Sequence, residues 1–350
     1  MPRLIQALPD GPLDILGDIH GELEALLALL HRLGVDPEKK RASRPLVFVG
    51  DLVDRGPDSV GVVELFARLQ DAGIAFGVAG NHELNVLAAD EKEGNGWILG
   101  HADHAKIDNV AIPFVSRAAT PSERAFVRAR LAELPLVLER PDLRVVHACW
   151  DPAAAAKLPA DGDIAGLAAS WAAEIDAELA RRGVPEHAAA ERDAWADLKE
   201  EARKPDRHLW AVVEEDLAHQ VGNPVKVLTS GVEVEVPAGA HFYTGGKWRF
   251  VARDRWWKRG TDRPTVVGHY WRRRGAPPPG KVDVWDDVPT FGWSGGVYCV
   301  DYSVGRRFVQ RAEGRVADFD GGLAALRWPE RTVVFDDREG ALPTHEAPTG

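Results

Sequence analysis

Short apolar runs alternate with helical patterns along the first part of the chain. Residues 13–16, 45–49 and 74–79 form apolar runs of strand length, and amphipathic helical patterns over 21–34 and 58–73 separate them. Both helical patterns close on a glycine, which commonly ends a helix. This order is typical of a mixed α/β core, in which helices connect neighbouring strands.

The alternation continues to about residue 150 and resumes far downstream. A helical pattern covers 121–134 and a strand pattern covers 143–147, and strand patterns return at 264–269 and 297–304. The intervening stretch is first Ala-rich and helical and then rich in Trp and Arg. We therefore expect a core in two parts, 11–150 and 261–335, an insert over 151–260, and a disordered tail over 336–350.

Composition places the chain among soluble globular proteins. Of its 350 residues, 45% are hydrophobic and 28% are charged, which is ordinary for this class. Two cysteines without a CxxC pair predict neither a disulfide framework nor a structural zinc site. The longest apolar run, 25–30, is too short for a membrane span, and the N-terminus lacks a secretion signal, so we expect a cytoplasmic protein. The formal net charge of −11 makes nucleic acid an unlikely partner.

Residues able to bind metals follow each of the first three predicted strands. The three loops are GDIHG (17–21), GDLVDRG (50–56) and GNHE (80–83). Asp18 and His20 are two residues apart, so both side chains point to one side of an extended segment. Carboxylate, imidazole and amide ligands together suit Mn, Fe or Zn rather than Ca. Three such loops in order predict a metal site at one edge of the sheet.

These loops resemble the signature motifs of the phosphoprotein phosphatase (PPP) branch of the calcineurin-like metallophosphoesterases. Within that branch the chain is similar to bacterial PrpE-type phosphatases and symmetrical diadenosine tetraphosphatases. Two later strand-end histidines complete the resemblance, His147 in VVHACW and His269 in VVGHY. The resemblance implies an α/β fold of four layers, with two mixed β-sheets packed face to face and helices outside, and a binuclear metal centre.

The resemblance also implies which residues bind the two divalent metal ions. Asp18 and His20 would hold the first metal, and Asp51 would bridge both metals. Asn81, His147 and His269 would complete the second. Manganese is the first expectation, with Fe, Zn, Co or Ni as alternatives. Two such ions can activate a bridging hydroxide that attacks phosphorus directly.

Three further residues are expected to have catalytic roles. Arg55 offers a planar fork that matches two phosphate oxygens. His82 would protonate the leaving oxygen, and Asp54 would bind the imidazole and fix its tautomer. We therefore interpret the crowding of Asp51, Asp54 and Arg55 in one loop as a catalytic loop.

A basic and Trp-rich stretch precedes and surrounds the last histidine. Residues 247–274 contain ten Lys or Arg against two Asp, and six tryptophans lie between Trp248 and Trp293. These residues either pack the insert against the core or form a basic, aromatic rim for extra phosphates or a nucleobase. PPP enzymes place a second phosphate-binding arginine before the last histidine. Arg249 and Arg253, four apart and expected on one helix face, are the candidates.

These features predict a metal-dependent phosphatase that hydrolyses phosphomonoesters. Its substrate would be a phosphoprotein, a nucleotide or a small molecule, and the alternative is a symmetrical dinucleoside tetraphosphate hydrolase. The chain has HAC where PPP protein phosphatases carry HGG, which weakens a phosphoprotein substrate, whereas it keeps Asp54 of the VDRG motif. A catalytically silent binding module is disfavoured because the motif set is complete. The oligomeric state remains open.

Overall fold

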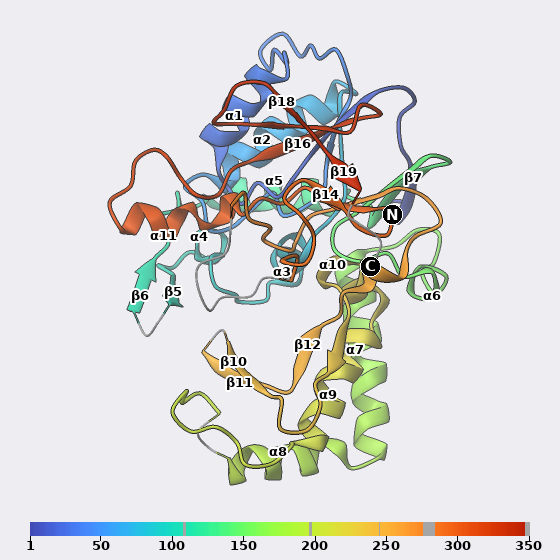
Figure 1. Ribbon diagram of the computed structural model, residues 1–350, viewed down its shortest axis with the longest axis vertical. Coiled ribbons are helices and arrows are strands. Elements are labelled where there is room, and N and C mark those ends of the chain that lie inside the picture. The colour runs from blue at the N-terminus through green and yellow to red at the C-terminus, as the bar shows by residue number, and fades with distance from the viewer. Residues whose placement is uncertain (108–109, 196–197, 245, 276–283, 347–350) are drawn as a thin grey trace.

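The computed structural model describes residues 1–107, 110–195, 198–244, 246–275 and 284–346. At its centre are two main β-sheets, with six and five strands. Helices lie around these sheets, and an elongated lobe formed by part of the insert extends from one end (Figure 1).

The six-stranded sheet has the order β18-β17-β16-β2-β3-β4. Its parallel half consists of β2 (Leu13–Leu16), β3 (Leu46–Phe48) and β4 (Ala75–Gly77). The crossover helices are α1 (Leu23–Arg32) and α2 (Ser59–Asp71). The antiparallel half consists of β16 (Ala324–Trp328), β17 (Thr332–Phe335) and β18 (Ala341–Pro343), with β16 paired to β2.

The five-stranded sheet has the order β1-β7-β8-β13-β15. Its strands are β1 (Ile5–Ala7), β7 (Val137–Arg140), β8 (Leu143–Val146), β13 (Thr265–Val267) and β15 (Val297–Cys299). The last three run parallel to one another, so their carboxyl ends meet at one edge of the sheet.

Alternation of side chains along the strands joins the layers. Ile15 and Val47 point into a core shared with Val145 and Val266 of the other sheet. The next residues, such as Leu16, belong to the outer core, where the helices pack. Because side chains alternate between the faces of a strand, a continuous apolar strand contributes to both cores. The four-layer α/β arrangement expected from the sequence is confirmed.

Shorter elements connect and flank the two sheets. After β4 come α3 (Asn81–Ala88), α4 (Gly96–Leu99), β5 (His104–Ile107), β6 (Val110–Pro113) and α5 (Pro121–Leu131). After β15 come a short 3₁₀ helix, η2 (Val304–Arg306), and α11 (Arg307–Ala312). Two short strands, β14 (Gly292–Trp293) and β19 (His345–Glu346), pair with each other.

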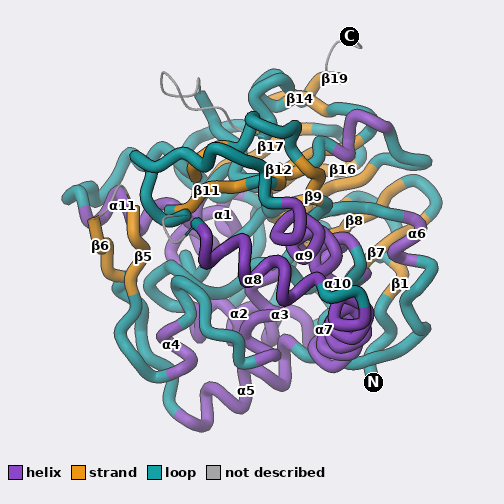
Figure 2. Tube along the Cα trace, turned by 90° about the horizontal axis from the view of Figure 1, so that it is seen from below, coloured by secondary structure: helices purple, strands orange, loops and turns teal. Residues whose placement is uncertain are grey.

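The region predicted as the insert contains five helices and four short strands among its described residues (Figures 1 and 2). The helices are α6 (Pro152–Ala155), α7 (Ile164–Arg181), α8 (Val184–Ala194), α9 (Trp210–Val221) and α10 (Pro224–Ser230). The strands are β9 (Glu233–Glu235), β10 (Phe242–Thr244), β11 (Lys247–Arg249) and β12 (Val251–Arg253), followed by the 3₁₀ helix η1 (Trp256–Arg259). It has its own small core, to which Ala188 and Phe250 belong.

The expectation of a disordered tail from residue 336 is wrong for its described part. Strand β18 pairs with β17 and strand β19 pairs with β14, so the chain remains ordered to residue 346. The prediction relied on the low apolar content of this segment. An edge strand, however, depends more on backbone pairing than on buried side chains. Residues 347–350 lie outside the described residues. No helix within the described ranges has the length and apolar character to cross a bilayer.

Candidate metal and phosphate site

The predicted site residues come from the carboxyl ends of strands in both sheets. Strands β2, β3 and β4 lead into GDIHG, GDLVDRG and GNHE, which carry Asp18, Asp51 and Asn81. Strands β8 and β13 of the other sheet lead to His147 and His269. The rule that parallel strands deliver functional groups to their carboxyl edge therefore holds for two sheets at once.

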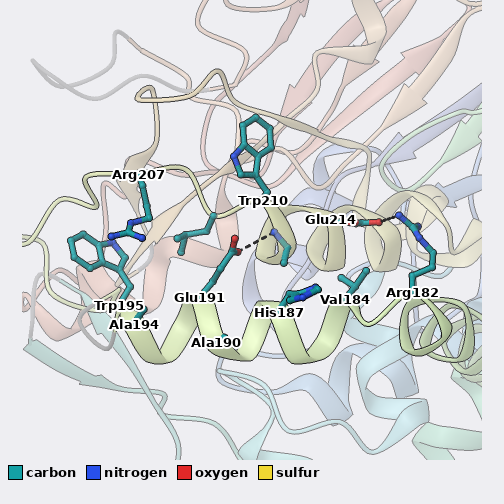
Figure 3. Close-up of a pocket in the computed structure, with 12 residues that line it drawn as sticks. Arg182, Val184, His187, Ala190, Glu191, Ala194, Trp195, Arg207, Trp210 and Glu214 are labelled. Atoms are coloured by element: carbon teal, nitrogen blue, oxygen red, sulfur yellow. Dashed lines mark hydrogen bonds and ion pairs between the residues drawn. The ribbon is translucent and has the colours of Figure 1, made fainter.

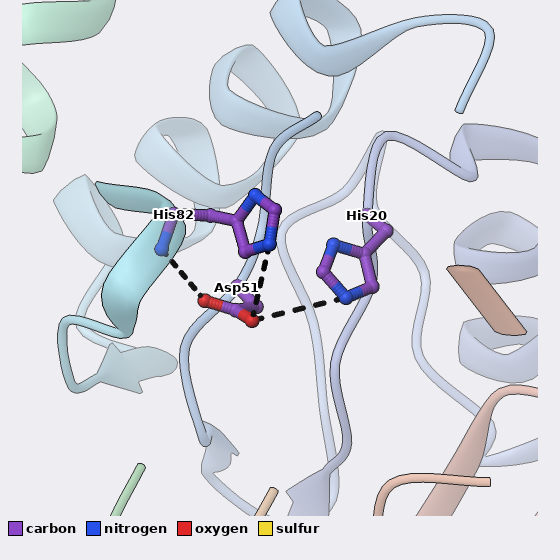
Figure 4. A group of neighbouring side chains, drawn as sticks. All are labelled: His20, Asp51 and His82. Atoms are coloured by element: carbon purple, nitrogen blue, oxygen red, sulfur yellow. Dashed lines mark hydrogen bonds and ion pairs between the residues drawn. The ribbon is translucent and has the colours of Figure 1, made fainter. Parts of the chain in front are cut away.

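The Asp51 carboxylate lies at the centre of this cluster. Its Oδ2 is 3.8 Å from Nε2 of His20, 3.3 Å from Nε2 of His147 and 3.9 Å from Nε2 of His82. Figure 4 shows the His20 and His82 rings next to each other, each directed at the Asp51 carboxylate; their centres are 4.7 Å apart. Asp51 belongs to two groups whose potential ligand atoms lie within 4.8 Å of one another, one with His20 and His82 and one with His147 and His269.

Asp18 and Asn81 connect the cluster across the two sheets. Asp18 Oδ2 accepts the backbone N–H of His269 at 3.0 Å and lies 3.8 Å from Nε2 of His20. Oδ1 of Asn81 lies 2.9 Å from Nδ1 of His269. All six side chains that the sequence predicted as metal ligands therefore gather in one place.

Two imidazole nitrogens in this cluster fit a metal ion. Nδ1 of His147 can donate to the carbonyl of Val49 at 2.8 Å, which leaves Nε2 with a lone pair. Nε2 of His147 and Nε2 of His269 are buried and make no hydrogen bond within the described residues. Ligand histidines in proteins usually have one ring nitrogen oriented by such a carbonyl and the other on the metal. The donor set of carboxylate, imidazole and amide therefore suits intermediate divalent cations.

Negative charge is concentrated at the same place. Burial and the neighbouring Asp301 raise the pKa of Asp18 well above its usual range, and burial raises the pKa of Asp301 to about 6. Burial also opposes ionisation of Asp51, but His147, His82 and His20 hold its pKa well below the usual value. Burial lowers the pKa of His147, yet the Asp51 charge outweighs it and raises that pKa to about 10. Bound cations would relieve this accumulation of buried carboxylates.

The backbone of the site is unusual. Positive φ angles occur at His20 (48°), Asp51 (49°), Asp54 (76°), Arg55 (68°) and His269 (71°). Residues other than glycine rarely adopt this conformation, and clusters of them are found at functional sites.

Glu83 holds two of the loops in place. Its carboxylate accepts the backbone N–H groups of Asp51, Leu52 and Gly80, each at 2.8 Å. Close approach also requires glycine at position 80, because a Cβ there would collide with Oδ1 of Asp51. The GDLVDRG and GNHE loops are thus joined through one buried side chain.

The three predicted catalytic residues lie beside the Asp51 carboxylate. Nδ1 of His82 is 2.6 Å from Oδ2 of Asp54, so its Nε2 is the atom that faces Asp51. Nη1 of Arg55 is 2.8 Å from Nε2 of His20, and its guanidinium lies 4.5 Å from the centre of the Trp271 ring. The arrangement supplies an oriented imidazole and a cation next to the candidate metal ligands.

The two candidate arginines of the insert do not share a helix. Arg249 is on β11 opposite Phe242, whereas Arg253 is on β12 opposite Glu233. Arg253 is exposed and lies 5.8 Å from the Tyr270 ring. Burial and then the charge of Arg253 lower the pKa of His269, which places Arg253 near the cluster. No described contact connects Arg249 to it.

The expected aromatic rim is largely core. Trp256, Trp257, Trp285 and Trp293 are buried, and Trp257 stacks on Trp285 with ring centres 4.2 Å apart. Trp271 differs, because it is half-buried and its ring lies over Arg55.

Several basic residues of this stretch are also engaged. Arg255 and Lys258 pair with Asp287, and Arg272 is buried and donates to backbone carbonyls. Packing, the first of the two sequence interpretations, therefore explains most of these residues.

Sequence reasoning missed three residues of the site. Trp97 donates its indole N–H to Oδ1 of Asp54 at 2.7 Å. Asp301 accepts the backbone N–H groups of Trp271 at 2.6 Å and Ser303 at 2.8 Å. Asp301 follows β15 at the same sheet edge as the two late histidines, so the strand-end rule could have found it. Trp97 and Trp271 gave no comparable signal.

A cavity of about 580 Å³ lies elsewhere, between α8 and the start of α9 (Figure 3). Glu191 accepts the backbone N–H of Ala211 there, and Arg182 pairs with Glu214. Its lining includes Trp195 and none of the cluster residues. The cavity is therefore not part of the candidate site.

Comparison with known proteins agrees with the motifs. Residues 11–123 match the calcineurin-like phosphoesterase family. The chain is 35% identical over 149 residues to the asymmetrical bis(5′-nucleosyl)-tetraphosphatase PrpE of Geobacillus thermodenitrificans, covering 39% of this chain and 56% of that protein. It is 43% identical over 74 residues to the symmetrical bis(5′-nucleosyl)-tetraphosphatase of Pseudomonas fluorescens, covering 21% of this chain and 24% of that protein. It is 39% identical over 90 residues to serine/threonine-protein phosphatase 2 of Escherichia coli, covering 25% of this chain and 38% of that protein.

Each match covers only part of this chain and only part of the relative. The chain spans at most 56% of the length of these three relatives. The GDIHG, GDLVDRG and GNHE loops all lie within the part that the family matches. Residues 11–123 are therefore similar to calcineurin-like phosphoesterases over the part of the chain that carries all three loops.

Proposed function

We propose that this chain is a metal-dependent phosphatase that hydrolyses phosphomonoesters at a binuclear centre. The observation that carries the proposal is the position of Asp51, which is shared by two groups of buried histidines. The His82–Asp54 pair and Arg55 lie beside it. One carboxylate shared by two ligand groups is what a pair of closely spaced metal ions requires.

The proposed ligands divide between the two ions as the motifs suggest. Asp18 and His20 would hold the first ion, Asp51 would be shared by both, and Asn81, His147 and His269 would hold the second. Bound there, the two cations would supply Lewis acidity and lower the pKa of a water molecule. We propose manganese as the metal and the cytoplasm as the location.

The remaining residues bind the phosphate and move a proton. In its imidazolium form His82 donates its Nδ1–H to Asp54, so the proton on Nε2 can pass to the leaving oxygen and leave a neutral imidazole. Arg55 binds two phosphate oxygens through its planar fork. The Trp271 ring, packed against the Arg55 guanidinium, keeps that fork oriented.

The substrate is a phosphoprotein, a nucleotide or a dinucleoside polyphosphate. Monoester hydrolysis is the first choice because all three residues are present, with Asp54 hydrogen-bonded to His82 and Arg55 hydrogen-bonded to the neighbouring His20. Hydrolysis of a dinucleoside tetraphosphate is the second choice. It is supported by the names of two relatives and by Arg253, an exposed cation 5.8 Å from the ring of Tyr270, the residue after His269.

A substrate panel and one variant pair test the proposal. Manganese-loaded protein should hydrolyse p-nitrophenyl phosphate and a phosphopeptide faster than diadenosine tetraphosphate. His82→Ala should keep two metals per chain and lower kcat by about 10²–10⁴, because it removes the general acid. His101→Ala, at an exposed histidine paired with Glu91, is the control and should match the native rate.

Two outcomes would contradict the proposal. Cleavage of diadenosine tetraphosphate with little monoesterase activity would favour the second choice. Two bound metals without hydrolysis of any substrate in the panel would favour a silent binding module.

A further inference from the structure

The carboxylate of Asp54 has a second buried partner besides His82. Its Oδ2 lies 2.6 Å from Nδ1 of His82, and its Oδ1 accepts the indole N–H of Trp97 at 2.7 Å. Asp54 has no exposed surface and Trp97 is only 3% exposed. Both hydrogen bonds of the Asp54 carboxylate are therefore shielded from bulk water.

The two donors together fix the orientation of the Asp54 carboxylate, which one donor alone would leave free to rotate. With His82 alone, the carboxylate could rotate about its last torsion and present either oxygen to the imidazole. The indole N–H occupies Oδ1, so only Oδ2 remains for His82. Tryptophan can only donate at this atom, so Oδ1 of Asp54 is the acceptor there and Oδ2 is the acceptor that faces Nδ1 of His82.

Trp97 lies in α4, directly after the loop that connects α3 to α4. Its backbone carbonyl accepts the N–H of Ala119 at 2.9 Å, and its ring belongs to the outer core. In the same loop the carbonyl of Gly94 accepts the backbone N–H of Arg55 at 3.1 Å. Asp103 accepts the N–H of Gly94 at 2.5 Å and thereby closes the loop. One segment thus supports both residues of the strained Asp54–Arg55 pair.

We propose that Trp97 is the positioning residue of the His82–Asp54 pair. In this role Trp97 contacts neither the substrate nor a metal ion. It holds the plane of the Asp54 carboxylate, which keeps Nε2 of His82 directed at the proposed metal centre. The inference rests on the proposed function for its kinetic consequence, whereas the hydrogen bond itself can be tested without any activity.

The first test is spectroscopic and uses metal-free protein labelled with ¹⁵N-histidine. The Nδ1-bound proton of His82, assigned by its loss in His82→Ala, should resonate at low field because the bond to Asp54 is short. Trp97→Phe removes only the donor and should shift or broaden that resonance. Trp328→Phe is the matched control, because its indole also donates to a carboxylate, Asp142, at 3.0 Å but away from the cluster. An unchanged His82 resonance in Trp97→Phe would overturn the proposal.

A second variant leaves Trp97 in place in case Trp97→Phe does not fold. Asp54→Asn should move the indole N–H resonance of Trp97, since a neutral amide is a weaker acceptor than a carboxylate. The indole resonance of Trp328 should stay in place. If both indole resonances are unmoved, the bond to Asp54 is not made in solution and the proposal fails.

The kinetic test compares two leaving groups in manganese-loaded protein. Trp97→Phe should lower kcat on phenyl phosphate about tenfold, the effect of one hydrogen bond to a charged group, with KM unchanged. The loss on p-nitrophenyl phosphate should be smaller, because that leaving oxygen needs less protonation. Equal losses on both substrates would indicate a merely structural role and overturn the proposal. If the native protein hydrolyses neither substrate, the proposed function fails and the spectroscopic test alone decides the role of Trp97.

Discussion

At the scale of single residues, the site depends on neighbours that hold side chains against their ordinary preferences. The left-handed conformations of Asp51 and Asp54 are fixed by hydrogen bonds from outside their own loop, through Glu83 and Ser59. Such conformations persist only where the surroundings over-determine them. Buried carboxylates are another sign of such constraint, and Asp14 is one of those that lie outside the cluster.

Asp14 gives a pH-dependent prediction at this scale. It is 1% exposed on β2, and its Oδ1 lies 3.3 Å from Nε of Arg327 without making a hydrogen bond. Burial therefore outweighs Arg327 and raises the pKa of Asp14 from 3.8 to about 6. Because the folded state holds this proton more tightly than the unfolded state, stability falls as pH rises from about 4 to about 6.

Replacing the carboxyl group should remove this part of the pH dependence. Relative to native protein, Asp14→Asn should gain up to about 3 kcal/mol in unfolding free energy between pH 4 and pH 7. Urea unfolding of the metal-free proteins at several pH values measures it, with the exposed Asp10→Asn as control. A constant difference between Asp14→Asn and native protein across this range would show that Asp14 titrates normally.

The residues that sequence could predict are those that belong to short motifs. Asp18, Asp51 and Asn81 each stand beside a glycine at the end of an apolar run, so local pattern identifies them. Trp97 acts on a partner 43 residues away, and nothing in GNGWIL marks its indole as a donor to Asp54. Contacts of this kind depend on the packed loop and are visible only in three dimensions.

At the scale of elements, long periodic segments were predicted well and short strands were not. The runs at 13–16 and 143–147 correspond closely to β2 and β8. The spacing of Arg249 and Arg253 was interpreted as helical, but the buried Phe250 separates two three-residue strands. A spacing of four residues is compatible with either structure when the segment is too short to show its period.

Because Arg249 and Arg253 lie on different strands, we expect their substitutions to affect KM differently. Arg253→Ala should raise KM for a phosphomonoester about tenfold or more, because it removes a cation that lies 5.8 Å from the ring of Tyr270, next to His269 in the chain. Arg249→Ala should leave KM unchanged and serves as the matched control on the neighbouring strand. Steady-state kinetics of both variants measure the difference. Equal effects of the two substitutions would show that the insert contributes general positive charge only.

At the scale of the whole molecule, the proposed metal centre would join the two sheets. Asp18, Asp51 and Asn81 follow strands of the six-stranded sheet, whereas His147 and His269 follow strands of the other. A ligand that binds only the folded state stabilises it, by about 2.7 kcal/mol at a hundredfold excess over Kd. Metal binding should therefore be measurable as stability of the complete fold.

Metal removal tests this prediction. Manganese should raise the Tm of metal-free protein by several degrees, a chelator should reverse the rise, and elemental analysis should find two metals per chain. Asp51→Asn should lose both metals and the rise in Tm, because it removes the shared carboxylate. Asp71→Asn, which affects a surface ion pair with Arg130, should behave as the native protein does. An equal rise in Tm for Asp51→Asn would contradict the bridging role.

The order of strands in the two sheets also has a consequence during synthesis on the ribosome. Strand β2, among the first elements to emerge, pairs with β16 near the other end of the chain, and β8 must wait for β13 beyond the whole predicted insert. The five-stranded sheet cannot be completed before β15 has been made, and the six-stranded sheet cannot be completed before β18 has been made. The nascent chain therefore exposes open strand edges for most of its elongation, a state in which aggregation competes with folding.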